Sequence, residues 1–150
     1  MNICVVGTGY VGLVTGAVFA DLGNDVVCVD NDRAKIEALA VGRMPIYEPG
    51  LEEMVGRNVD DRRLAFTTDL RAGIHHGDVI FIAVGTPPKE TGETDLSHVE
   101  AVAAEIGRCM DRYKVVVNKS TAPVGTGELV REVIARHQPR PVEFDVVSNP

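Results

Sequence analysis

Three glycines near the N-terminus, Gly7, Gly9 and Gly12, have the G-x-G-x-x-G spacing of a turn that binds the pyrophosphate of a dinucleotide. An apolar run at residues 2–6 precedes them and small apolar residues follow at 11–22, so the turn is expected to join a strand to a helix. There, Gly7 takes the tight turn, Gly9 lets phosphate oxygens approach the backbone, and Gly12 brings the helix against the sheet. Phosphate would meet free amides at the positive end of the helix. A plain tight turn is the alternative interpretation.

A carboxylate in the next strand strengthens the dinucleotide interpretation. Asp30 ends the second expected strand, 18 positions after Gly12, where it can accept hydrogen bonds from the adenine ribose hydroxyls. Because a 2′-phosphate would meet like charge there, Asp30 favours NAD over NADP. Arg33 and Lys35 leave open the alternative that a basic group compensates for that charge. The other interpretation of Asp30 is a solvated strand end, or a helix cap shared with Asp32.

Two later loops combine hydroxyl groups with turn-forming residues. Residues 85–88, which include Thr86, follow the expected strand 78–84, and residues 119–126 follow the expected strand 114–118. Ligands collect at the carboxyl ends of the strands in open α/β sheets, so both loops are expected at the ligand edge. The Thr86 hydroxyl is placed to touch the nicotinamide ribose or a phosphate. Ordinary turn and cap chemistry is the alternative for both loops.

Short β-branched runs alternate with longer stretches whose apolar residues recur every three or four positions, which is typical of a parallel sheet. Asp95 is the expected cap of the helix at 96–110. The pattern predicts one α/β domain over residues 1–150. Its fold is Rossmann-type and doubly wound, with a mainly parallel six-stranded sheet and helices on both faces. The expected strands are 2–6, 25–30, 64–68, 78–84, 114–118 and 143–147, and the expected helices are 11–22, 32–41, 51–57, 96–110 and 129–137.

Composition excludes several classes of function. The chain is 45% hydrophobic and 25% charged, as in an ordinary soluble globular domain. A net charge of −7 and the lack of a basic stripe argue against nucleic-acid binding. The N-terminus does not read as a signal peptide, and the longest apolar run, residues 79–84, is too short to span a bilayer. A cytoplasmic protein without a membrane partner is therefore expected.

The cysteines and histidines predict no metal site, because their spacing suits neither a metal site nor a disulfide framework. Buried, reduced thiols and solvated or partly packed imidazoles are the expected states. These residues are Cys4, Cys28, Cys109, His75, His76, His98 and His137.

Five ordered segments resemble the UDP-glucose/GDP-mannose dehydrogenase family, most closely its bacterial UDP-glucose 6-dehydrogenases. The resemblance covers all 150 residues. The segments are 7–12 (GTGYVG), 45–53 (PIYEPGLEE), 81–88 (FIAVGTPP), 119–126 (KSTAPVGT) and 148–150 (SNP).

The resemblance implies an activity for the whole enzyme. It oxidises the C6 alcohol of UDP-glucose to a carboxylate in two NAD-dependent steps and releases UDP-glucuronate. An aldehyde forms first, and a cysteine in a later domain captures it as a thiohemiacetal, which is oxidised to a thioester and hydrolysed. The family's central dimerisation domain and C-terminal substrate domain are expected outside these residues. This chain alone is thus expected to bind NAD without catalysis, and the full-length enzyme to be a homodimer or higher oligomer.

The resemblance also implies roles for individual residues. Thr121 resembles the hydroxyl that positions a catalytic water or oxyanion, and it is the expected catalytic residue of this chain. Tyr47 and Glu48 lie in a matching segment, but loop packing is their default interpretation. The cofactor contacts implied by the glycine motif and the resemblance together are Gly7, Gly9, Tyr10, Val11, Gly12, Asp30, Lys35, Thr86 and Thr121.

Two alternatives to UDP-glucose oxidation stay open. The first is a related dehydrogenase that acts on GDP-mannose or a UDP-N-acetylhexosamine, because sugar recognition comes largely from the family's later domains. The second is a non-catalytic nucleotide-sensing module, in which cofactor binding changes the affinity for a partner.

Overall fold

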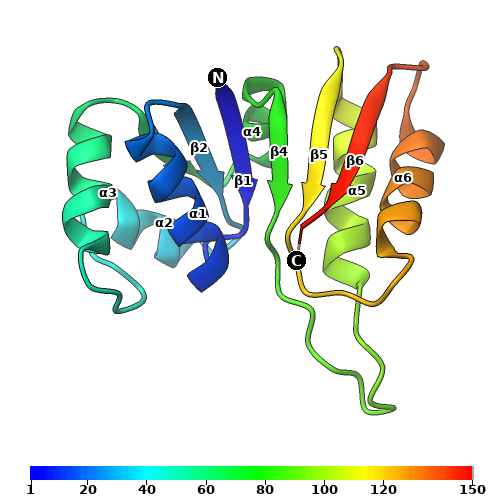
Figure 1. Cartoon of the computed structure of the whole chain (residues 1–150), viewed down its shortest axis with the longest axis horizontal. Coiled ribbons are helices and arrows are strands. Elements are labelled where there is room, and N and C mark those ends of the chain that lie inside the picture. The colour runs from blue at the N-terminus through cyan, green and yellow to red at the C-terminus, as the bar shows by residue number, and fades with distance from the viewer. Residues whose placement is uncertain (150) are drawn as a thin grey trace.

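The computed structural model describes residues 1–149, and its centre is one sheet of six strands (Figure 1). The spatial order is β3-β2-β1-β4-β5-β6, and the five pairings between these strands are all parallel. Valine and isoleucine dominate these runs because a parallel sheet is covered on both faces. The strands are β1 (Asn2–Val6), β2 (Asp25–Val29), β3 (Leu64–Thr67), β4 (Val79–Ile82), β5 (Lys114–Asn118) and β6 (Phe144–Ser148).

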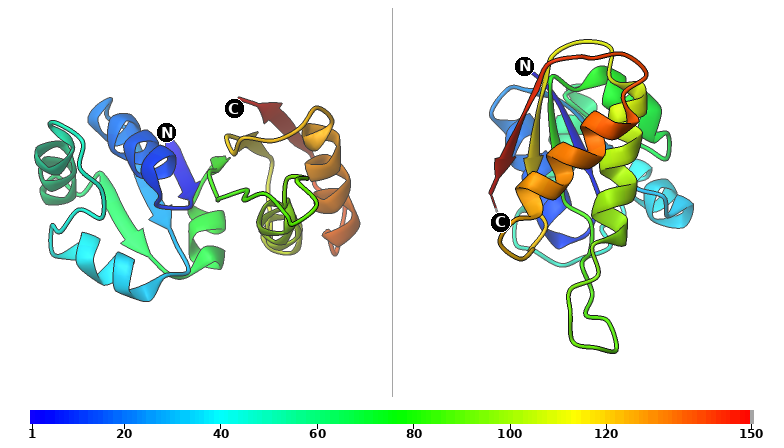
Figure 2. Two further views of the ribbon diagram at one scale, coloured as in Figure 1. Left: turned by 90° about the horizontal axis from the view of Figure 1, so that it is seen from below. Right: turned by 90° about the vertical axis from the view of Figure 1, so that its right-hand side faces the viewer.

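Six helices cover the two faces of this sheet (Figure 2). One apolar core joins the sheet to α1 (Tyr10–Asp21), α2 (Arg33–Ala40) and α3 (Leu51–Asp60). The other joins it to α4 (Leu70–His76), α5 (Ser97–Cys109) and α6 (Thr126–His137). The side chains of β1 alternate between the two cores, with Val5 in the first and Val6 in the second.

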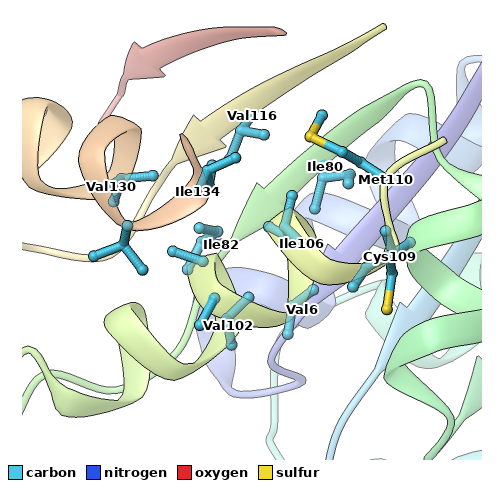
Figure 3. Packing of buried hydrophobic residues seen from close by; sticks show 14 of the residues in the cluster. Val6, Ile80, Ile82, Val102, Ile106, Cys109, Met110, Val116, Val130 and Ile134 are labelled. Carbon is cyan, nitrogen blue, oxygen red and sulfur yellow. The ribbon is translucent and has the colours of Figure 1, made fainter. Parts of the chain in front are cut away.

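The second core holds the helices that follow β4 and β5. Ile106 of α5 and Ile134 of α6 pack against Ile82 and Val116 of the sheet, and all four side chains are fully buried (Figure 3). Burial of such side chains contributes about 1.5–3 kcal/mol each relative to exposure. This packing joins β4 and β5 to α5 and α6, and the two candidate hydroxyl loops begin at the carboxyl ends of these strands.

The strand order reverses at β1. Val6, the last residue of β1, is in register with Val29 of β2 and with Ile82 of β4. The chain leaves β1 towards α1 on one face and, through a longer loop, leaves β4 towards α5 on the other. In open α/β sheets a ligand crevice forms at the carboxyl side of such a reversal. Three strands end at this crevice, β1, β2 and β4. The residues that directly follow them are Gly7, Asp30 and Ala83.

The predicted α/β class, the doubly wound topology and the helices on both faces are confirmed. Several bounds differ: β4 is shorter than predicted, and α3 extends to Asp60 rather than ending at 57. The predicted cap at Asp95 is also wrong, because Leu96 is the N-cap of α5. The Asp95 carboxylate still accepts a hydrogen bond from the Ser97 amide at 2.9 Å, so it stabilises the turn that leads into α5.

The helix α4 is not predicted by the sequence pattern. It is only seven residues long, and the polar pair His75-His76 leaves too few apolar positions to show a helical period. One local signal does mark it. The Asp69 carboxylate accepts a hydrogen bond from the Ala72 amide at 3.0 Å, as an N-cap does.

Candidate cofactor site

The turn after β1 requires glycine at two of its three glycine positions. Gly7 has a φ of +102°, and its amide donates to the Val29 carbonyl at 2.7 Å. A Cβ on Gly7 would overlap the carbonyl oxygen of Ala83, and a Cβ on Gly12 would overlap the carbonyl oxygen of Gly7. These contacts hold α1, β1 and the end of β4 at a separation that only glycine permits.

Gly9 differs, because nothing lies within 4 Å of a Cβ built on it. Gly9 is the N-cap of α1 and no side chain caps the helix. Its carbonyl accepts from the Leu13 amide at 2.9 Å, which leaves the preceding amides of the first turn without an intrahelical partner. The space above Gly9 and the amides of Tyr10 and Val11 are therefore the candidate anion site at the helix N-terminus.

Asp30 is held by four donors. Its Oδ2 accepts from the Thr8 amide at 2.8 Å, from the Thr8 hydroxyl at 2.7 Å and from Lys35 Nζ at 3.2 Å. Its Oδ1 accepts from the Asp32 amide alone, at 3.0 Å. A carboxylate oxygen has room for a further donor, so Oδ1 is the atom available to a ribose hydroxyl.

The electrostatics keep Asp30 ionised. Burial raises the pKa of the carboxyl. Hydrogen bonds from Asp32, Thr8 and Lys35 lower it by more than burial raises it, so the pKa lies below its usual range. Asp32 in turn caps α2 through the Lys35 amide at 3.1 Å. The helix cap, which was an alternative interpretation of Asp30, is thus supplied by Asp32.

A cleft of about 440 Å³ lies over these strand ends. Of the predicted contacts, Gly7, Gly9, Asp30 and Lys35 line it. The remaining predicted contacts, Tyr10, Val11, Gly12, Thr86 and Thr121, do not line this cleft. The further lining residues are Val6, Val29, Asn31, Thr68, Leu70, Ala83, Val84, Gly85, His98, Ala101 and Val102.

Thr86 and Thr121 lie together beside the cleft. The Thr86 hydroxyl donates to the Thr121 backbone carbonyl at 2.7 Å, and the Thr121 side chain is exposed. Because a hydroxyl has one hydrogen, Thr86 retains only acceptor capacity for any ligand. Its predicted contact with a ribose is therefore restricted to accepting a hydrogen bond.

Two buried hydroxyls that support the site were not predicted from the sequence. Thr8 is fully buried beneath Asp30, and Ser120, which is 5% exposed, donates to the Val84 carbonyl at 2.8 Å. Thr8 could have been found from its position between Gly7 and Gly9, because Asp30 at the end of the second strand is a carboxylate that its hydroxyl can reach. Ser120 directly precedes Thr121 and carries no comparable signal.

The three cysteines are free and buried. Burial raises the pKa of the Cys4 thiol to about 12 and that of Cys28 still further. Burial and a hydrogen bond to the Glu105 carboxylate raise the pKa of Cys109.

Over residues 1–149, no cluster of three or more His, Cys, Asp and Glu side chains is arranged to hold a metal ion. No helix in that range has both the length and the apolar character that a membrane span requires.

These features fit NAD. The glycine turn offers free amides to a pyrophosphate, and Asp30 Oδ1 offers an acceptor to a ribose. A doubly wound sheet with this turn and this carboxylate defines a dinucleotide-binding domain of the dehydrogenase type. The family is shown by the match of residues 1–150 to the model of the UDP-glucose/GDP-mannose dehydrogenase family, NAD binding domain. The chain belongs to that family and is its NAD-binding domain.

Individual relatives agree with this assignment. The chain is 55% identical over 149 residues to UDP-glucose 6-dehydrogenase TuaD of Bacillus subtilis, covering 99% of this chain and 32% of that protein. It is 51% identical over 154 residues to UDP-glucose 6-dehydrogenase of Pseudomonas aeruginosa, covering 100% and 34% respectively. The chain spans about a third of the length of the curated relatives it matches.

Solved structures share the fold. A UDP-glucose dehydrogenase from Pyrobaculum islandicum superposes with a TM-score of 0.95 at 44% identity, covering 100% of this chain and 36% of that one. A GDP-mannose dehydrogenase from Pseudomonas aeruginosa gives 0.94 at 37% identity, also covering 100% and 36%.

Proposed function

We propose that this chain binds NAD for an enzyme that oxidises UDP-glucose to UDP-glucuronate, a precursor for polysaccharide synthesis. One observation carries the choice of sugar. Among the solved structures, identity is 44% to a UDP-glucose dehydrogenase, against 37% to a GDP-mannose dehydrogenase and 30% to a UDP-N-acetylmannosamine-type dehydrogenase, and it is 39–55% to curated proteins named UDP-glucose 6-dehydrogenase. Catalysis requires the longer protein, because the chain matches only about a third of those relatives.

The residues around the cleft receive distinct roles in this proposal. The amides of Gly9, Tyr10 and Val11 bind the pyrophosphate, and Gly7 and Gly12 hold the turn that presents them. Asp30 accepts a hydroxyl of the adenine ribose through Oδ1, and Lys35 holds that carboxylate in place.

Thr86 and Thr121 serve the reacting half of the cofactor. Thr86 accepts a hydrogen bond from the nicotinamide ribose, and the exposed hydroxyl of Thr121 positions a reacting water or oxyanion. The nicotinamide, when bound, supplies hydride acceptance. This chain thus contributes binding and orientation, and no cysteine within it is proposed as the nucleophile.

The proposal extends to partners and location. UDP-glucose is the substrate of the full-length enzyme, which we propose to be a homodimer or higher oligomer. A cytoplasmic location accompanies it and is supported by three unpaired cysteines, which suit a reducing compartment.

The test is NADH formation by the full-length protein with UDP-glucose, GDP-mannose and UDP-N-acetylmannosamine. The proposal expects two NADH per UDP-glucose and a kcat/KM at least about tenfold higher than for either other sugar. Turnover of GDP-mannose alone would select the second candidate, which the TM-score of 0.94 to a GDP-mannose dehydrogenase supports. NAD binding without turnover of any sugar would select the nucleotide-sensing module.

A further inference from the structure

Ser120 is bound to the end of β4 through both its main chain and its side chain. Its hydroxyl donates to the Val84 carbonyl at 2.8 Å and lies 3.3 Å from the Ile82 carbonyl. Its amide donates to the same Ile82 carbonyl at 3.0 Å, as does the Lys119 amide at 2.9 Å. Only 5% of the Ser120 surface is exposed.

A second bond runs between the same two loops in the opposite direction. The Thr86 hydroxyl in the β4 loop donates to the Thr121 carbonyl in the β5 loop at 2.7 Å. Val84, Thr86, Ser120 and Thr121 therefore form a reciprocal pair of hydroxyl-to-carbonyl bonds, named here the β4–β5 clasp. Val84 also lines the cofactor cleft, so the clasp connects the cleft wall to Thr121.

The clasp assigns different jobs to its hydroxyls. Ser120 is buried and has committed its one hydrogen to Val84, so it cannot serve a substrate directly. The Thr121 hydroxyl is exposed and has no hydrogen-bond partner within residues 1–149. One residue is thus fixed, and its neighbour is free to react.

We propose that Ser120 is a positioning residue that sets the Thr121 hydroxyl relative to the cofactor cleft. The inference rests on the proposed function, which gives Thr121 its part in the reaction. Removing the Ser120 hydroxyl leaves the partly buried Val84 carbonyl without that donor and loosens the backbone that carries Thr121. A displacement of about 1 Å at a reacting group can cost about 100-fold in rate.

The test compares Ser120→Ala, Thr121→Ala and the double variant in the full-length enzyme. Ser120→Ala should lower kcat about 10- to 100-fold and change the KM for NAD less than about threefold. Thr121→Ala should lower kcat about 10²- to 10⁴-fold. Since Ser120 acts through Thr121, the double variant should match Thr121→Ala alone.

Asn58→Ala is the matched control for lost stability. Asn58 is fully buried in α3, on the other face of the sheet, and donates to Asp21 Oδ1 at 3.0 Å and to the Met54 carbonyl at 2.8 Å. This variant should lower the Tm at least as much as Ser120→Ala while kcat stays within about twofold. If Ser120→Ala does not fold, Ser120→Cys is the second variant: its thiol keeps the shape of the side chain but is only a weak donor to the Val84 carbonyl, so it should fold and still lower kcat.

Each result bears on a definite claim. If Ser120→Ala has a normal kcat while Thr121→Ala is impaired, only the positioning role of Ser120 is overturned. The same holds if the kcat losses of the two single variants multiply in the double variant. A normal kcat for Thr121→Ala overturns both that role and the proposed function of Thr121. A wild-type enzyme that oxidises no nucleotide sugar removes the proposed function, and the positioning role with it.

Discussion

Thr8 and Asp30, 22 residues apart, are joined by two hydrogen bonds to a single oxygen: the amide and the hydroxyl of Thr8 both donate to Asp30 Oδ2, at 2.8 and 2.7 Å. This pair ties the glycine turn after β1 to the end of β2. It also leaves Oδ1 of the carboxylate with one protein donor, the Asp32 amide. The pyrophosphate and ribose parts of the candidate site are thereby fixed relative to each other.

Replacing Thr8 by valine tests this pair. Valine keeps the shape of the fully buried side chain but removes the hydroxyl that donates to the carboxylate. The free energy of unfolding should fall by about 1.5–3 kcal/mol, as for a hydrogen bond to a charged group. Urea denaturation measures the change. A variant as stable as the wild type would show that the second bond from Thr8 contributes nothing.

The lowered pKa of Asp30 predicts a pH dependence with a definite sign. A carboxyl whose pKa is lower in the folded than in the unfolded state stabilises the fold above its unfolded pKa of about 3.9. That stabilisation is lost as the pH falls through the lower, folded pKa. The stability gap between the wild type and Asp30→Asn should therefore be widest near neutral pH and shrink below about pH 4. A gap that grows on acidification would contradict the ionised Asp30.

Replacement by alanine should impair NAD binding at Gly9 and folding stability at Gly12. Gly9 has an ordinary φ of −69° and open space around its Cβ position, so Gly9→Ala should fold with an unchanged Tm. The added methyl group occupies the space where phosphate approaches, and NAD affinity should fall at least about tenfold in calorimetry.

Gly12→Ala is the counterpart, because its Cβ would overlap the Gly7 carbonyl. It should lower the free energy of unfolding by about 3 kcal/mol or more, as overpacking against a fixed backbone does. Equal Tm changes for Gly9→Ala and Gly12→Ala would contradict the turn geometry.

The thiols should be unreactive in the native chain. Cys4 and Cys28 are fully buried and Cys109 is 8% exposed, and all three have raised pKa values. Titration with an aromatic disulfide reagent at pH 8 should detect no fast-reacting thiol in the folded protein and three after denaturation. A rapid reaction in the native state would reopen the question of a nucleophile within these residues.

Much of this fold could be predicted because strand and helix periodicity dominate its chain. The glycine turn and Asp30 were identifiable because their residue types are required by backbone geometry and charge at fixed spacing. Ser120 and Thr8 were not, because a buried hydroxyl acts through partners distant in sequence, Val84 and Asp30. The helix α4 was hidden for a related reason: tertiary packing, rather than its own pattern, stabilises it.

The decisive measurement is NAD binding by the 150-residue chain. Calorimetric titration with NAD and with NADP should give saturable binding of NAD, with NADP weaker by at least about tenfold because Asp30 repels the 2′-phosphate. Asp30→Ala should weaken NAD binding and reduce the ratio of NAD affinity to NADP affinity. Undetectable NAD binding, or a preference for NADP, would rule out the NAD site proposed at the glycine turn and Asp30.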